Sequence, residues 1–118
     1  MAFKFEKLEV WQLALEMANN IHLLTRNFPK EEMFSLTSQI KRAADSVALN
    51  IAEGSTGQSD AEQQRFLGYA QRSALEVVCA LHLSFKRAYL TKEIFEINHN
   101  ELTILVKRIQ SFKNSFNK

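Results

Sequence analysis

The chain has 118 residues, with 15 Lys and Arg against 13 Asp and Glu, so its formal net charge is +2. This length suits one domain with a substantial core, and so small a charge does not by itself argue for a nucleic-acid binder. Three glycines and one proline are too few for a fold of many turns, which favours long helices over a strand-rich protein. The single cysteine excludes an intramolecular disulfide, and the chain lacks both an apolar run of 18 residues and an apolar signal core. We therefore expect a cytoplasmic protein without a membrane span.

The first predicted helix runs from about residue 8 to residue 27. Residues 1–7 precede it as an arm, whose Phe3 and Phe5 we expect to pack on the bundle or on a neighbouring subunit. Pro29 disfavours helical geometry at the residue before it and so ends the helix. The expected inner stripe consists of Trp11, Ala14, Ala18, Ile21 and Phe28, widened by Leu15, Met17 and Leu24.

The second predicted helix, residues 36–54, has the clearest apolar period of the chain. Its stripe has spacings of three and four residues and consists of Leu36, Ile40, Ala43, Val47 and Ile51. Ser35 is the expected N-cap, and Gly54 the expected left-handed cap at the other end.

Two further helices are predicted, at about residues 60–89 and 92–114. Ser59 and Glu62 have the spacing of a capping box at the start of the third helix. Its expected buried face is Phe66, Ala70, Ser73, Val77, Ala80, Leu81, Ser84 and Ala88, and that of the fourth is Leu102, Leu105, Ile109, Phe112 and Phe116. The weakly helical stretch 98–100 predicts a kink. Short connections make consecutive helices neighbours, so the sequence predicts an all-α, antiparallel up-and-down four-helix bundle in a single domain over residues 1–118.

A row of polar residues flanks the apolar stripe of the second helix: Gln39, Arg42, Ser46, Asn50 and Glu53. Across the turn to the third helix, Arg42 is expected within reach of Glu76, and Glu53 near Arg65. Because buried charges persist only when they are paired, these seven residues predict a buried or interfacial polar network that fixes the helix register.

The sequence offers no constellation for catalysis or for a cofactor. His22, His82 and His99 lie on three different predicted helices without metal-ligand spacing, and Cys79 is expected to be a small core residue. No nucleophile-elbow or P-loop motif occurs. We therefore expect no catalytic, cofactor-binding or metal site and no enzyme activity.

Basic residues are concentrated in the second half of the chain. The candidate nucleic-acid-binding residues are Lys86, Arg87, Lys107, Arg108 and Lys113, followed in the sequence by Lys118. Phosphate binding requires several such charges on one surface. The competing interpretation is ordinary solvated helix surface, and no stacking aromatic residue stands among these positions.

Motifs throughout the chain resemble one known family. They are Phe5, Leu8-Glu9-Val10-Trp11, Phe28-Pro29, Leu36-Thr37-Ser38-Gln39, Arg42-Ala43, Ser46, Asn50-Ile51-Ala52-Glu53-Gly54, Phe66-Leu67, Ala70, Ser73, Glu76 and Tyr89-Leu90. Together they resemble the 23S rRNA intervening-sequence proteins, over about residues 5–110. Arg72 departs from the pattern, because relatives often carry glycine there.

The resemblance implies a four-helix bundle that assembles into a homo-oligomeric ring, a pentamer in related proteins. The chain also resembles the accessory protein of diversity-generating retroelements, which associates with a reverse transcriptase and nucleic acid. The favoured function is therefore a non-enzymatic bacterial assembly protein that contacts RNA, DNA or a reverse-transcriptase-like protein. The alternative is a structural protein–protein interaction module without a nucleic-acid role.

Overall fold

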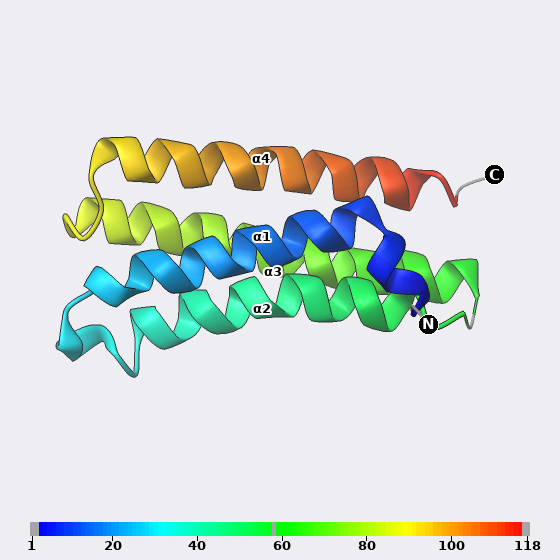
Figure 1. Cartoon of the computed structure of the whole chain (residues 1–118), viewed down its shortest axis with the longest axis horizontal. Coiled ribbons are helices and arrows are strands. Elements are labelled where there is room, and N and C mark those ends of the chain that lie inside the picture. Colours follow the sequence, from blue (N-terminus) through cyan, green and yellow to red (C-terminus); the bar gives the residue numbers. More distant parts are fainter. Residues whose placement is uncertain (1–2, 58, 117–118) are drawn as a thin grey trace.

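Four α-helices make up most of the chain in the computed structural model, which describes residues 3–57 and 59–116 (Figure 1). Short 3-10 turns lie before α1 and between α1 and α2. The elements are η1 (Lys4–Lys7), α1 (Glu9–Leu24), η2 (Thr25–Asn27), η3 (Lys30–Glu32), α2 (Leu36–Gly54), α3 (Asp60–Lys86) and α4 (Lys92–Asn114). No strand occurs in the two described ranges, so the predicted all-α helical bundle is confirmed.

Each helix packs against two others: α1 and α3 both contact α2 and α4. The result is an elongated molecule with extents of 45 × 24 × 22 Å. The loops α1–α2 and α3–α4 lie at one end of the bundle, and the α2–α3 turn lies at the other end with the N-terminal segment (Figure 1).

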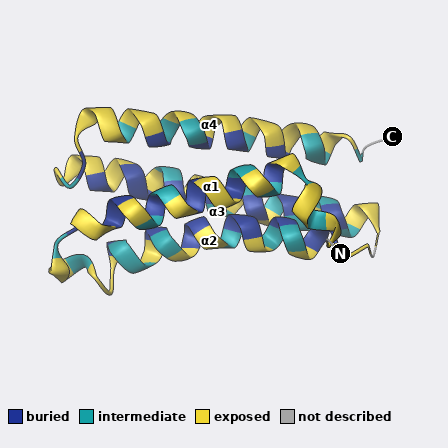
Figure 2. Cartoon of the chain, viewed as in Figure 1, coloured by how far each residue is buried: buried dark blue, intermediate teal, exposed yellow. Residues whose placement is uncertain are grey.

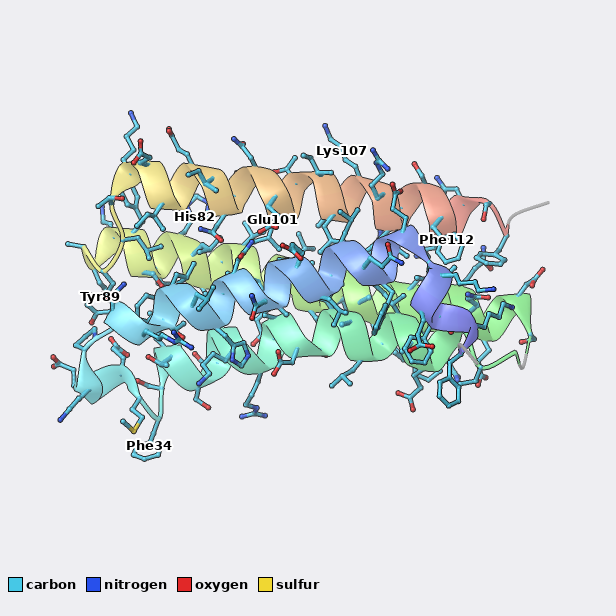
Figure 3. The ribbon with its side chains drawn as sticks, viewed as in Figure 1. Phe34, His82, Tyr89, Glu101, Lys107 and Phe112 are labelled. Atoms are coloured by element: carbon cyan, nitrogen blue, oxygen red, sulfur yellow. The ribbon has the colours of Figure 1, made fainter. Side chains whose placement is uncertain are left out.

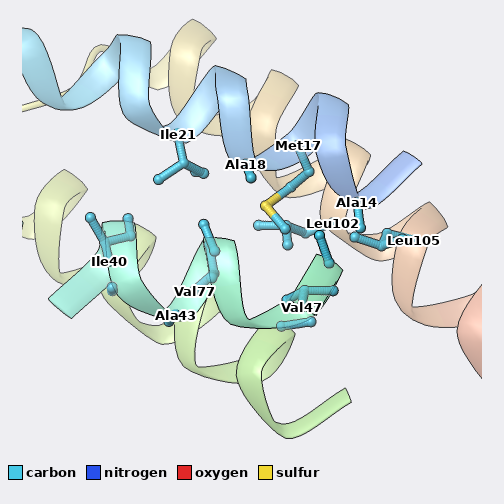
Figure 4. Packing of buried hydrophobic residues seen from close by; sticks show 14 of the residues in the cluster. Ala14, Met17, Ala18, Ile21, Ile40, Ala43, Val47, Val77, Leu102 and Leu105 are labelled. Carbon is cyan, nitrogen blue, oxygen red and sulfur yellow. The ribbon is translucent and has the colours of Figure 1, made fainter. Parts of the chain in front are cut away.

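The core lies along the middle of the bundle, where buried positions of all four helices face one another (Figure 2). Met17, Ile40, Val77 and Leu102 come from four different helices, and each is fully buried (Figure 4). Burying one such side chain stabilises the fold by roughly 1.5–3 kcal/mol. The predicted stripe of α2 is buried throughout.

Of the two caps predicted for the second helix, the one at Gly54 is wrong, and Ser35 is the N-cap residue but does not cap with its side chain. Gly54 does not adopt a left-handed conformation; it is the buried last residue of α2, and the described glycine with positive φ is Gly57, at 92°. Ser35 does not cap α2 with its side chain, because its Oγ donates to Oε1 of Glu32 at 2.7 Å. The same carboxylate oxygen accepts from the backbone N of Leu36 at 3.4 Å, so the Glu32 side chain supplies the capping acceptor.

Several expected boundaries and burials also change. The α-helical part of the first predicted helix stops at Leu24, and Leu15 is 44% exposed because it lies outside the buried stripe. Helix α3 ends at Lys86, since Ala88 turns to a left-handed φ of 63° and is exposed. Helix α4 is continuous through the stretch expected to kink, and there Asn98 donates its side-chain amide to the carbonyl of Ile94 at 2.9 Å.

The expected N-terminal arm is a 3-10 turn from residue 4 rather than an extended segment, and residues 1–2 lie outside the described part of the chain. The ring of Phe5 packs edge-on against Trp11, with centroids 4.9 Å apart. The arm therefore covers the start of α1 within the same chain.

Glu32 joins the two loops at one end of the bundle. Besides its contacts at the start of α2, its Oε2 accepts from the hydroxyl of Tyr89 at 2.7 Å and from Nη1 of Arg87 at 3.2 Å. Hydrogen bonds from Ser35 and then Tyr89 lower the pKa of the Glu32 carboxyl below its usual range. The same bond raises the pKa of the Tyr89 phenol, because it stabilises the protonated hydroxyl.

Replacing Glu32 by Gln should lower the melting temperature at neutral pH. Because the folded-state pKa lies below the unfolded value of about 4.3, the charge contributes stability above that value and loses it as the pH falls through the folded pKa. The gap between parent and Glu32→Gln, followed by circular dichroism, should therefore be full at pH 7 and shrink in acid below about pH 4. Glu31→Gln is the matched control, since Glu31 is exposed; equal melting of all three proteins at pH 7 would contradict this role.

Replacing Gly54 by Ala should destabilise the protein, although alanine is the better helix former. A Cβ at Gly54 would lie 2.7 Å from Cβ of Phe66, so α2 and α3 would have to separate. Overpacking of this kind costs roughly 1–3 kcal/mol. Urea unfolding measures the change, and a Gly54→Ala variant as stable as the parent would show that the approach of the two helices is not tight.

Candidate anion-binding groove

The predicted polar row of α2 faces α3, and its central part forms a hydrogen-bonded cluster. Oγ of Ser46 lies 2.9 Å from Oγ of Ser73, and the amide of Asn50 donates to the carbonyl and hydroxyl oxygens of Ser46 at 2.9 and 3.0 Å. This half-buried cluster ties α2 to α3. Ser73 was predicted only as a member of the apolar face.

The charged members of the row are exposed and do not form the expected pairs. Arg42 and Glu76 line one hollow of about 410 Å³ between α2 and α3, together with Gln39, but no ion pair joins them. Arg65 pairs with Glu62 on its own helix at 3.0 Å instead of with Glu53. The charges of the row therefore face solvent in the single chain.

The five basic residues expected to bind nucleic acid do not gather on one surface. Arg87 is bonded to Glu32, and Arg108 pairs with Glu9 of α1. Lys86, the last residue of α3, and Lys113, in the last turn of α4, lie at opposite ends of the bundle. Lys107 stands on the outer side of α4 (Figure 3). Lys118 lies outside the described residues.

A set of cations that shares only Lys113 with the predicted five surrounds a groove between α3 and α4, with a volume of about 700 Å³. Arg65 and Arg72 project from α3, and Lys113 from the last turn of α4. No carboxylate belongs to its lining among the described residues, although Glu62 is bonded to Arg65 beside it. The other lining residues are Ala61, Gln64, Gly68, Tyr69, Gln71, Leu75, Val106 and Gln110.

Amide side chains hold the two walls of the groove together. Nε2 of Gln64 donates to the backbone carbonyl of Lys113 at 3.3 Å, and Nε2 of Gln71 donates to Oε1 of Gln110 at 2.6 Å. On the α3 side the Arg65 guanidinium lies 5.4 Å from the centroid of the Phe66 ring, which packs edge-on against Tyr69. The groove is therefore a braced surface with three positive charges and one exposed aromatic ring. Guanidinium and ammonium groups of this kind bind phosphate oxygens with charge-assisted hydrogen bonds.

A second hollow carries basic residues as well. Arg26, Lys30 and Lys41 line a space of about 440 Å³ beside the α1–α2 loop. His22 also lines it and is bonded to Oδ1 of Asp45 at 3.0 Å. It is smaller than the α3–α4 groove.

The structure brings together two histidines that the sequence placed on separate helices. The ring centroids of His82 and His99 lie 5.6 Å apart, and both rings pack against Phe95. Cys79 is exposed beside His82 rather than buried, because it lies on the outer face of α3, so the expected core position is wrong. Within the described residues no group of three or more His, Cys, Asp or Glu side chains is placed to hold a metal ion.

The prediction for one face of α2 succeeded, and those that depend on how two helices are aligned failed. Helical periodicity correctly identified the face of α2 that meets α3. It could not show that Arg72 and Lys113, 41 positions apart, border the same groove. The sequence signal that could have indicated the groove was the mixture of cations and glutamines on the outer side of α3.

Among the described residues, no helix combines the length and the apolar character that a membrane span requires.

Comparison with known proteins agrees with this architecture. The family model for 23S rRNA-intervening sequence proteins matches residues 6–111. A crystal structure of a protein of unknown function from the S23 ribosomal protein family of Bacteroides thetaiotaomicron superposes with a TM-score of 0.79 at 29% sequence identity, covering 88% of this chain and 97% of that chain. A search of curated proteins found no match. On the strength of the matched residues and the shared fold, the chain belongs to the family of 23S rRNA-intervening sequence proteins.

Proposed function

We propose that this chain is a non-enzymatic assembly protein, an antiparallel bundle that forms a homo-oligomer and binds the phosphate backbone of nucleic acid in the α3–α4 groove. The observation that carries the proposal is the charge of that groove: its described lining has three cations and no carboxylate, and only Arg65 of the three is paired, with Glu62 beside the groove. Phosphate neutralisation by Lys and Arg supplies most of the affinity of non-specific nucleic-acid binding.

Assembly increases the strength of such a site. A net charge of +2 on one chain gives weak long-range attraction, but a symmetric oligomer repeats each groove once per subunit. Linked copies on one nucleic-acid strand bind together far more tightly than a single copy does. We propose a ring, a pentamer as the family resemblance implies.

An apolar strip beside the α1–α4 contact supports an interface. Ile97 and Ile104 lie seven residues apart on one side of α4 and are 63% and 52% exposed. Between them Glu101 accepts from the amide of Asn20 on α1 at 3.1 Å, so a polar bridge holds the strip in place (Figure 3). Leu23 of α1 is 44% exposed. Exposed apolar patches of this kind mark surfaces for another protein.

Removing the groove charges should weaken nucleic-acid binding. In the triple variant Arg65→Gln/Arg72→Gln/Lys113→Gln, the plot of log affinity against log salt should become less steep by about two to three. Each lost phosphate contact removes about 0.7–0.9 from the magnitude of its negative slope. Fluorescence anisotropy with a labelled oligonucleotide measures the slope. The matched control is Arg26→Gln/Lys30→Gln/Lys41→Gln, which removes equal charge from the smaller basic hollow and should keep the parental slope. If the control loses the slope and the groove variant keeps it, the site is misplaced.

The oligomer should be visible in solution as a particle several times heavier than one chain. Light scattering coupled to size-exclusion chromatography should give a mass near five chains for the parent and a smaller mass for Ile97→Glu/Ile104→Glu, because carboxylates resist burial at an interface. A parent protein that is monomeric at micromolar concentration would contradict self-assembly. The exposed strip would then favour the second candidate, an interaction module for a different protein.

A further inference from the structure

Gly68 is a residue that the packing of the fold does not require. It lies inside the 27-residue helix α3, where glycine destabilises the helix relative to alanine. A Cβ built at Gly68 would meet only Nζ of Lys113, at an ordinary 3.7 Å, and this atom ends a flexible side chain. At Gly54, by contrast, the added atom would lie 2.7 Å from Phe66. The two glycines therefore need different explanations.

Because Gly68 has no side chain, its backbone forms part of the groove surface. Arg65 lies three residues before it on α3 and Arg72 four residues after it, so both stand on the same side of the helix. Lys113 of α4 lies opposite. Any side chain at position 68 would occupy the space between these cations. Gly68 is thus the floor of a site surrounded by positive charge, and the flexible Lys113 side chain reaches over it.

The surface around this floor suits a flat ring with polar edges. Tyr69 is 40% exposed and is held edge-on by Phe66 at 5.5 Å, so its ring is available at the border of the groove. Leu75 adds apolar surface at 58% exposure. The amides of Gln71 and Gln110 also line the groove, where they are bonded to each other at 2.6 Å. Aromatic stacking combined with backbone cations is the arrangement with which proteins bind single-stranded nucleic acid.

We propose that the floor at Gly68 receives one unpaired base of a single-stranded nucleic acid. The Lys113 side chain turns aside to a flanking phosphate, which lets the base pack on the backbone of α3 beside Tyr69. Arg65 and Arg72 contact the flanking phosphates as well. Bases in a duplex are paired and stacked, so a duplex reaches only the cations. This inference rests on the proposed phosphate binding in the groove and adds a preference for single strands.

The test compares single-stranded and duplex binding after the floor is filled. Labelled oligonucleotides of about a dozen nucleotides, single-stranded RNA, single-stranded DNA and the corresponding duplex, span a typical site. Gly68→Met and Tyr69→Leu should each weaken single-strand binding roughly ten-fold, the order expected for one lost stacking contact. Duplex binding and its salt slope should stay at the parental value. A comparison of single-stranded RNA with single-stranded DNA shows whether the affinity depends on the sugar.

Folding of the variants is checked independently. Methionine is a good helix former, so Gly68→Met should melt at or above the parental temperature. Asn100→Met places the same side chain on an exposed position of α4 and should bind both probes like the parent.

Each failure has a separate signature. If the filled-floor variants bind single strands like the parent, or lose single-strand and duplex binding equally, the base site is wrong while phosphate binding in the groove stands. If the triple charge variant binds every probe like the parent, the groove does not bind phosphates, and the base site fails with it.

Discussion

The close approach of α2 and α3 is the constraint on which the rest of the structure depends. Gly54 allows the end of α2 to meet Phe66, and the hydroxyls of Ser46 and Ser73 meet at 2.9 Å further along the same contact. The first contact tolerates no added atom, and the second requires two short polar side chains to stand opposite each other. Together they fix how far α3 is displaced along α2, and therefore where every outward side chain of α3 stands.

The groove follows from that fixed position because α4 packs on α3. Hydrogen bonds from the side-chain amides of Gln64 and Gln71 to α4 keep the last turns of α4 beside the first half of α3. Lys113 consequently lies over Gly68, between Arg65 and Arg72. Two glycines thus have opposite roles in adjacent helices: Gly54 allows α2 and α3 to touch, and Gly68 leaves space at the surface of α3.

Much of the fold was predictable from the sequence because helical period and helix ends are local properties. The apolar stripe of α2, its bounds at Leu36 and Gly54, and the capping of α3 by Ser59 agree with the structure. Predictions failed where a residue has a partner from a distant part of the chain. Gly54 was expected to serve as a cap because its contact with Phe66 cannot be read from neighbouring residues. The hydrogen bonds that Glu32 accepts from Tyr89 and Arg87 likewise have no signal in the neighbouring sequence. The groove was missed for the same reason, since adjacent basic pairs such as Lys107-Arg108 point in directions about 100° apart on a helix.

The Glu32 carboxylate makes the two ends of the rod unequal. It fastens the loop before α2 to the loop after α3, whereas the opposite end has the α2–α3 turn with Gly57 at positive φ. Backbone amides near the fastened end should exchange their hydrogens with solvent slowly, and those beside the turn should exchange first, because local opening begins where fewest bonds must break. Fraying would then proceed from one direction only, and it would reach the first half of α3 before it reaches the Tyr89 hydroxyl.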